Sequence, residues 1–125
     1  MNHHIQQYPP KDLLSNSYLS AGRDDGLWVF IPAVSLTMGI WALVLWFLGV
    51  PSWVFLMVGL EGVAIGWLHN YIHEGTHLRY FWLEKSPWFQ KLRTLHWVHH
   101  WNMRRNFGIC WFGWDHVFGT YKAPK

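Results

Sequence analysis

The stretch from Leu27 to Leu48, which carries no charged residue, limits what this chain can fold into more than any other feature. As an α-helix it would be about 33 Å long, enough to cross the ~30 Å hydrocarbon core of a bilayer. A second apolar stretch follows at 53–72, and the link at 49–52 consists largely of turn-forming residues. Two helices joined by so short a link must run antiparallel. The sequence therefore predicts an all-α fold with transmembrane helices at about 27–48 and 53–72, forming a membrane hairpin.

The composition agrees with a membrane protein. Hydrophobic residues make up 51% of the chain and charged residues only 14%, whereas soluble domains carry about a quarter charged residues. This balance excludes a disordered tail, and the single cysteine excludes an internal disulfide. The net charge of +3 comes without a basic stripe, so no nucleic acid is expected as a partner. Residues 1–26 lack the pattern of a secretory signal and are interpreted as a polar, partly mobile N-terminal arm.

Charge placement predicts how the hairpin is oriented. Lys and Arg occur on both sides of the hairpin but not in the link at 49–52. The positive-inside rule then places both termini on the cytoplasmic side of an integral membrane protein. After the hairpin, aromatic and basic residues alternate, which is typical of helices at the membrane surface. Gly62 and Gly66 form a small-residue face expected to let the two membrane helices approach closely.

The first histidine cluster lies where the second apolar stretch ends. His69, His73 and His77 are spaced four residues apart, so a helix would place them on one face. His69 and His77 would still be about 12 Å apart along the helix axis. Because a metal–imidazole bond is only ~2.1 Å long, one ion cannot easily be held by all three. The spacing favours two metal positions, or one metal with a spare histidine, on the cytoplasmic side.

The second cluster, His96, His99 and His100, fits within one helical turn. Its three imidazoles can face one cavity together with those of the first cluster. Ligation by imidazole alone suits iron, zinc, copper or nickel. Because polar groups next to a membrane hairpin are costly, two such clusters are interpreted as a functional metal site.

Other polar residues have several interpretations. Glu61 would face the same way as His69, two turns deeper, as an acceptor for an imidazole N–H, as a protonated acid, or as a group satisfied by the partner helix. His3 and His4 are expected to be solvated in the N-terminal arm. His116 is expected not to be a ligand.

One alternative uses the HExxH pattern formed by His73, Glu74 and His77. In zinc proteases the two histidines bind zinc and the glutamate activates water. A membrane zinc metalloprotease would, however, leave His69 and the whole second cluster without a role.

The stretch from His69 to Tyr121 resembles the C-terminal half of the fatty acid hydroxylase/sterol desaturase superfamily of membrane non-haem di-iron oxygenases. The resemblance covers about residues 53–121, which gives an expected membrane domain at 27–121 and a tail at 122–125. It is carried by four motifs: HxxxH at His69 and His73, HxxHH at His96, His99 and His100, Asn106-Phe107-Gly108, and the closing WDxxFGTY of Trp114–Tyr121.

The resemblance implies an oxidoreductase that uses O₂ and an electron donor to hydroxylate or desaturate a fatty acyl or sterol C–H bond. Two irons, with zinc as the alternative metal, would be held by the six histidines of both clusters, with no catalytic residue beyond these ligands. Three further residues are expected to support the metal ligands or the fold around them without binding the metal. Glu74 would support them, Asp115 would be a supporting or structural carboxylate, and Asn106 would open a turn that packs the C-terminal segment under the metal cavity.

The chain also departs from this superfamily. Members usually carry two more histidine clusters upstream, where this sequence has only His3 and His4. The chain is then expected to be a fragment or a reduced form with half a site, or a homodimer or a second chain would complete the metal site. A non-catalytic metal-binding subunit is the third alternative.

Overall fold

Every regular element in the described part of the chain, residues 3–19 and 27–124, is a helix in the computed structural model. The prediction of an all-α fold is therefore confirmed. Part of the predicted N-terminal arm (residues 1–2 and 20–26) and the last residue of the predicted tail lie outside the described residues. The elements are η1 (His3–Gln7), α1 (Leu27–Phe47), α2 (Ser52–Thr76), α3 (Pro87–Trp101) and α4 (Gly113–Val117).

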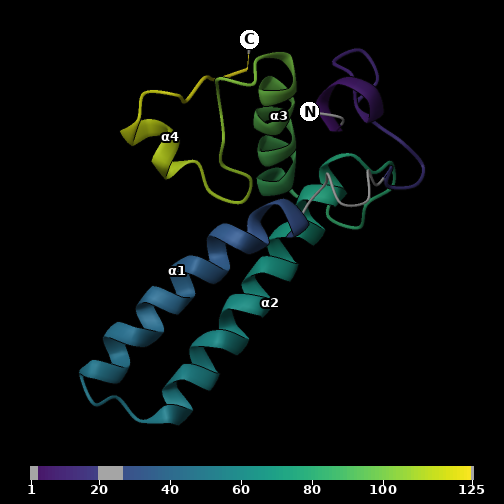
Figure 1. Ribbon diagram of the computed structural model, residues 1–125. Coiled ribbons are helices and arrows are strands. Elements are labelled where there is room, and N and C mark those ends of the chain that lie inside the picture. Colours follow the sequence, from purple (N-terminus) through teal and green to yellow (C-terminus); the bar gives the residue numbers. More distant parts are fainter. Residues whose placement is uncertain (1–2, 20–26, 125) are drawn as a thin grey trace.

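Helices α1 and α2 form the antiparallel hairpin, and its closed end lies far from the other elements (Figure 1). Both helices expose apolar side chains to their surroundings, such as Trp46 at 66% and Val63 at 74% of their full exposure. In the described part, only α2 is both long and apolar enough to cross a membrane, while the apolar run found in α1 is Val34–Phe47. That both helices cross a membrane therefore stays a prediction.

The helix boundaries lie close to the expected ones, with one difference. Helix α2 continues past residue 72 to Thr76, so it carries the first histidine cluster to its C-terminal end. The close approach of the two helices expected at Gly62 and Gly66 stays a prediction, but glycine is not required at Gly62, because a Cβ there would meet its nearest neighbour, Met38 Cε, at an ordinary contact distance of 3.8 Å. An alanine would therefore fit at this position.

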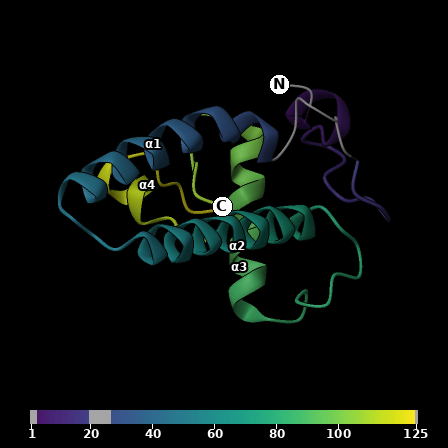
Figure 2. The same ribbon diagram turned by 60° about the horizontal axis from the view of Figure 1, so that its bottom comes forward.

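The core lies where α3 packs against the end of α2 (Figure 2). Its buried members are Ile72, Phe81, Phe89 and Leu92. Gly75 is required by this packing, because a Cβ there would lie 2.5 Å from the Phe81 ring. Glycine therefore continues α2 despite its low helix propensity, since no larger residue would leave room for the ring.

Arg93 ties α3 to the C-terminal end of α2. Its guanidinium donates hydrogen bonds to the carbonyls of Gly75 (3.1 Å) and Leu78 (2.9 Å). A positive group is favourable at a helix C-terminus, where carbonyls lack partners within the helix. The contact holds together the two helix segments that carry the histidine clusters.

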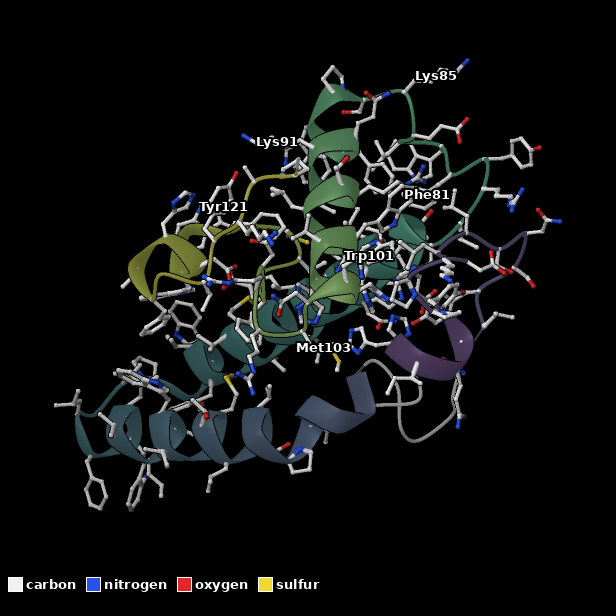
Figure 3. The ribbon with its side chains drawn as sticks, turned by 90° about the horizontal axis from the view of Figure 1, so that it is seen from above. Phe81, Lys85, Lys91, Trp101, Met103 and Tyr121 are labelled. Carbon is white, nitrogen blue, oxygen red and sulfur yellow. The ribbon has the colours of Figure 1, made fainter. Side chains whose placement is uncertain are left out.

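The remaining elements flank α3 on opposite sides. Figure 3 shows η1 and Phe81 on one side of α3, and α4 and Tyr121 on the other. The histidine clusters face the side of η1, as the contacts below show. The C-terminal segment therefore lies against α3 on the side opposite to the histidine clusters.

Candidate metal centre

Four buried histidines converge at the junction of α2, α3 and η1. His77 caps the C-terminus of α2, His96 and His100 come from α3, and His3 begins η1. One ring nitrogen of each lies within 4.8 Å of those of the other three, and all four side chains are 5% exposed or less. The structure therefore brings residues of both predicted clusters together with one residue from the N-terminal arm.

Three distances between neighbouring ring nitrogens of this group match those between ligands of one ion. Nε2 of His77 lies 3.0 Å from Nε2 of His96, which lies 3.2 Å from Nε2 of His100. Nε2 of His3 lies 3.2 Å from that of His77. With metal–nitrogen bonds of ~2.1 Å, two ligands are about 3.0 Å apart at a right angle and about 3.4 Å apart at a tetrahedral angle. The observed spacings fall in this range.

Backbone carbonyls determine which nitrogen of two rings carries the proton. Nδ1 of His77 lies 3.0 Å from the Leu13 carbonyl, and Nδ1 of His100 lies 2.9 Å from the Tyr8 carbonyl. Since a carbonyl only accepts, each Nδ1 must donate, and in the neutral ring Nε2 then presents a lone pair. Metal-binding histidines are oriented in the same way, by a hydrogen bond from the second ring nitrogen.

His96 shows why a cation fits between these rings. Its Nε2 faces the lone pairs of both His77 and His100, but one proton can serve only one of them. Its buried Nδ1 has no hydrogen-bond partner in the described part of the chain. Without an ion, at least one nitrogen–nitrogen contact therefore lacks a proton, whereas a cation would be attracted to all the lone pairs. These residues fit a metal ion.

Burial keeps the imidazoles in the form that binds metals. It is the main cause that lowers the pKa of His77 to about 3, against the hydrogen bond to the Leu13 carbonyl, which raises it. Burial likewise lowers the pKa of His100 to about 2, and it holds the pKa of His96 well below its usual value. Neutral rings with free lone pairs are thus favoured at physiological pH.

The other three predicted ligands lie at increasing distances from this group. The buried His73 ring packs at 4.8 Å between centroids against His96 and at 5.5 Å against His77. His99 is half-buried, and its Nδ1 donates to the Arg105 carbonyl at 2.7 Å, which in the neutral ring leaves a lone pair on Nε2. His69 is exposed, two helical turns before the end of α2.

The hydrogen bonds described for Glu74 and Asp115 go to groups other than the clustered rings. Glu61 is exposed on α2. Glu74 is half-buried and accepts a hydrogen bond from Asn70 Nδ2 at 2.7 Å. The four-residue group joins His77 to α3 and η1 and does not include His73, so the geometry gives no support to the HExxH interpretation.

Asp115 and Asn106 instead form a clasp that holds the C-terminal segment against α3. The Asp115 carboxylate accepts hydrogen bonds from the backbone of Phe107 (2.7 Å) and Gly108 (2.8 Å), and from the Thr120 hydroxyl (2.6 Å). Asn106, at a φ of 50°, donates through Nδ2 to the carbonyls of Leu95 and Lys122 and accepts from the Lys122 N–H.

This clasp explains two of the sequence motifs. Asn tolerates the left-handed backbone region better than most residues, which accounts for the first position of Asn106-Phe107-Gly108. The turn that it opens follows Arg105, whose carbonyl orients His99. Asp115 and Asn106 thus position the loop after α3 and do not contact the clustered rings themselves.

The prediction that His3 and His4 are solvated is wrong. His3 is 5% exposed, and its ring lies 4.9 Å from His73 and 4.8 Å from His77 between centroids. His4 is half-buried and packs against His99 and His100. The available signal was that these are the only histidines upstream of the hairpin, where the superfamily usually has more. His116, expected not to be a ligand, lies exposed on α4 and stacks on Tyr121 at 4.0 Å.

Comparison with known proteins identifies the family. The fatty acid hydroxylase family model matches residues 26–120. This range extends the expected resemblance through the first hairpin helix. Searches of curated proteins and of solved structures return no match. With most of its length matched, and with histidines of both clusters (His77 of the first, His96 and His100 of the second) gathered at one site, the chain belongs to the fatty acid hydroxylase family.

Proposed function

We propose that this protein is a membrane oxidoreductase that uses O₂ to hydroxylate or desaturate a C–H bond of a fatty acyl or sterol lipid. The observation that carries the proposal is the convergence of neutral imidazole nitrogens 3.0–3.2 Å apart in a chain that matches the fatty acid hydroxylase family. An unactivated C–H bond needs a strong oxidant, which no side chain of this protein provides by itself. Iron, when bound, would supply the chemistry that activates O₂.

His77, His96 and His100 are proposed to hold the metal. Nε2 of His96 lies 3.0 Å from that of His77 and 3.2 Å from that of His100, and the hydrogen bonds from His77 and His100 to backbone carbonyls keep those two rings in place. His73 and His99, whose rings lie beside this group, are candidates to hold a second ion, with His69 at the outer end of the first cluster. Two irons are therefore proposed, with zinc as the alternative metal.

The protein contributes orientation and exclusion of water. Phe89, Leu92 and Leu95 on α3 are at most 2% exposed, so the histidine-bearing part of the helix rests on an apolar base. The centre lies at the end of α2, the helix that is long and apolar enough to cross a membrane. We propose that a lipid chain reaches the centre from the hydrocarbon, while the electron donor approaches from the cytoplasmic side.

The experiment measures metal content and lipid oxidation in the same preparations. Protein purified in detergent is loaded with Fe²⁺, desalted and assayed for iron by mass spectrometry. O₂ consumption is then followed with a chemical reductant and an acyl lipid or a sterol, and the lipid products are identified. The wild type is expected to hold iron and to form hydroxylated or desaturated lipid.

The matched variants separate the metal site from the rest of the surface. The triple variant His96→Ala/His99→Ala/His100→Ala is expected to lose both bound iron and activity. The exposed His116→Ala serves as the control and is expected to keep both. Iron retained in full by the triple variant would contradict the proposed site. A wild type that holds iron but oxidises no lipid, alone or with a full-length family member, would favour the non-catalytic metal-binding subunit.

A further inference from the structure

Glu61 is the only Asp, Glu, Lys or Arg residue between Leu27 and His73. It lies on α2, nine residues after the helix begins at Ser52, and therefore about 14 Å along a helix that is about 36 Å long. If α2 crosses a membrane, as predicted, this position falls well inside the ~30 Å hydrocarbon core. The carboxyl group then lies at a depth where water does not solvate it.

The structure leaves this carboxyl group uncovered. The Glu61 side chain is exposed, and none of the described residues donates a hydrogen bond to it or forms an ion pair with it. Figure 1 shows the half of α2 next to the hairpin link beside α1 and away from the other described elements. The residues one turn away on the same side of α2, and one at two turns, are exposed as well: Met57, Val58, Ala64, Ile65 and Leu68. Together with Glu61 they form the Glu61 face.

An uncovered carboxyl group at this depth is unfavourable. Ionisable side chains in membrane spans almost always face protein or water, and they pair with one another or with backbone carbonyls. Long Lys and Arg side chains near helix ends can reach the interface, but glutamate is shorter, and Glu61 lies more than two turns from either end of α2. No Lys or Arg occurs between residues 27 and 78, so the hairpin supplies no counter-ion of its own. The Glu61 face therefore requires a partner outside this chain.

A second copy of the chain offers a matching polar group without any further component. Copies that insert in the same orientation hold their Glu61 carboxyl groups at the same depth. A two-fold axis along the membrane normal then brings the two carboxyl groups together, and the apolar residues around them pack against their own copies in one isologous contact. A membrane protein of another sequence would need a polar group placed at that same depth.

We propose that two copies of the chain associate in the membrane through the Glu61 face, with the two carboxyl groups hydrogen-bonded to each other. At least one carboxyl group of the pair is protonated, so its O–H donates to an oxygen of the other and two negative charges do not face each other. Hydrogen bonds between helices stabilise their association in membranes. The inference rests on the predicted crossing of α2. It does not depend on the proposed chemistry, because Glu61 lies about 24 Å from His77 along the helix axis.

Disulfide cross-linking in lipid vesicles tests which side of α2 meets its copy. Cys110, the only native cysteine, is first replaced by Ser. A cysteine is then introduced either at Ile65, on the Glu61 face, or at Val63, which points to the opposite side of α2 and is 74% exposed. With iodine as the oxidant, Ile65→Cys is expected to form at least five times more disulfide-linked dimer than Val63→Cys.

Sedimentation equilibrium in density-matched detergent micelles measures the strength of the contact. In Glu61→Leu, which removes the hydrogen bond between the helices, the dimer dissociation constant is expected to rise about five- to thirtyfold. Glu61→Gln is expected to keep the dimer, because its amide both donates and accepts. Val63→Leu is the matched control on the opposite side of α2 and should behave like the wild type. Amide exchange of α3 in each variant reports whether the rest of the fold is intact.

The outcomes distinguish this contact from the proposed function. A wild type that is monomeric at every ratio of protein to detergent, or a Glu61→Leu variant that dimerises as tightly as the wild type, would overturn the proposal. Equal cross-linking of Ile65→Cys and Val63→Cys would overturn it as well. If the protein dimerises through Glu61 but binds no iron, the proposed function fails and this inference stands. If it binds iron and oxidises lipid as a monomer, the proposed function stands and this inference fails.

Discussion

Replacing Asp115 by Asn tests the clasp behind α3. Asp115 is 2% exposed, and its three hydrogen bonds are 2.6–2.8 Å long. Phe107 and Thr120 donate to Oδ1, and Gly108 donates to Oδ2. An Asn placed to keep the two bonds at Oδ1 would turn its NH₂ group toward the Gly108 N–H, so two donors would face each other.

The magnitude follows from these three contacts. An unsatisfied buried donor costs about 1–3 kcal/mol, and hydrogen bonds to a charged group contribute about 1 kcal/mol more each than neutral ones. Losing one partner and weakening two bonds therefore lowers the free energy of unfolding by about 3–5 kcal/mol. Because the clasp positions the loop that carries the Arg105 carbonyl, the orientation of His99 should loosen as well.

Unfolding in detergent micelles, followed by tryptophan fluorescence, measures this loss. Val117→Ala, at a 69% exposed position of α4, is the control and is expected to change the free energy of unfolding by less than about 0.5 kcal/mol. The reasoning would be refuted if Asp115→Asn were as stable as the control.

Two further predictions concern acid and packing. The lowered pKa values of His77 (about 3) and His100 (about 2) mean that only the unfolded chain takes up these protons as the pH falls below about 6.5. As the pH is lowered from 6 to 4, each ring should therefore reduce the free energy of unfolding of the metal-free protein by about 1.4 kcal/mol per pH unit. Unfolding curves that coincide at pH 7.5 and pH 5 would contradict this prediction. Gly75→Ala should lower the free energy of unfolding by about 1–3 kcal/mol, because the added methyl group would clash with the Phe81 ring. The control Gly59→Ala lies on the same helix with open space around it, and it should stabilise the protein slightly. Equal melting temperatures of the two variants would rule out the packing argument.

The hairpin helices and the histidine clusters could be predicted because their signals are local. Apolar runs and the spacings of His69, His73 and His77 depend only on the helical repeat. The continuation of α2 to Thr76 was harder to predict, because Gly75 disfavours a helix by itself. It is retained there because Phe81, six residues later, packs against it.

The docking of residues 3–19 on the histidine group could not be predicted, because it depends on contacts distant in sequence. These contacts are the hydrogen bonds from His77 and His100 to the carbonyls of Leu13 and Tyr8. Backbone carbonyls leave no trace in a sequence, and a polar stretch with Pro and Gly is typical of a mobile arm. The position of His3 beside the other buried histidines therefore appears only once the chain is folded.

The closing motifs were predicted in part. Asn106 was expected to open a turn that packs the C-terminal segment, and its φ of 50° and its bonds to Leu95 and Lys122 agree with that expectation. Sequence spacing could not distinguish a carboxylate that supports the ligands from a structural one. The contacts of Asp115 with backbone N–H groups and with Thr120 favour the structural role.

X-ray absorption at the iron edge of the Fe²⁺-loaded protein tests the central claim most directly. If His77, His96 and His100 hold the metal, the spectrum should show nitrogen neighbours at ~2.1 Å with the multiple scattering of several imidazole rings, and this signal should weaken in His96→Ala. A first shell of oxygen atoms without imidazole scattering, or a spectrum unchanged in His96→Ala, would contradict the account.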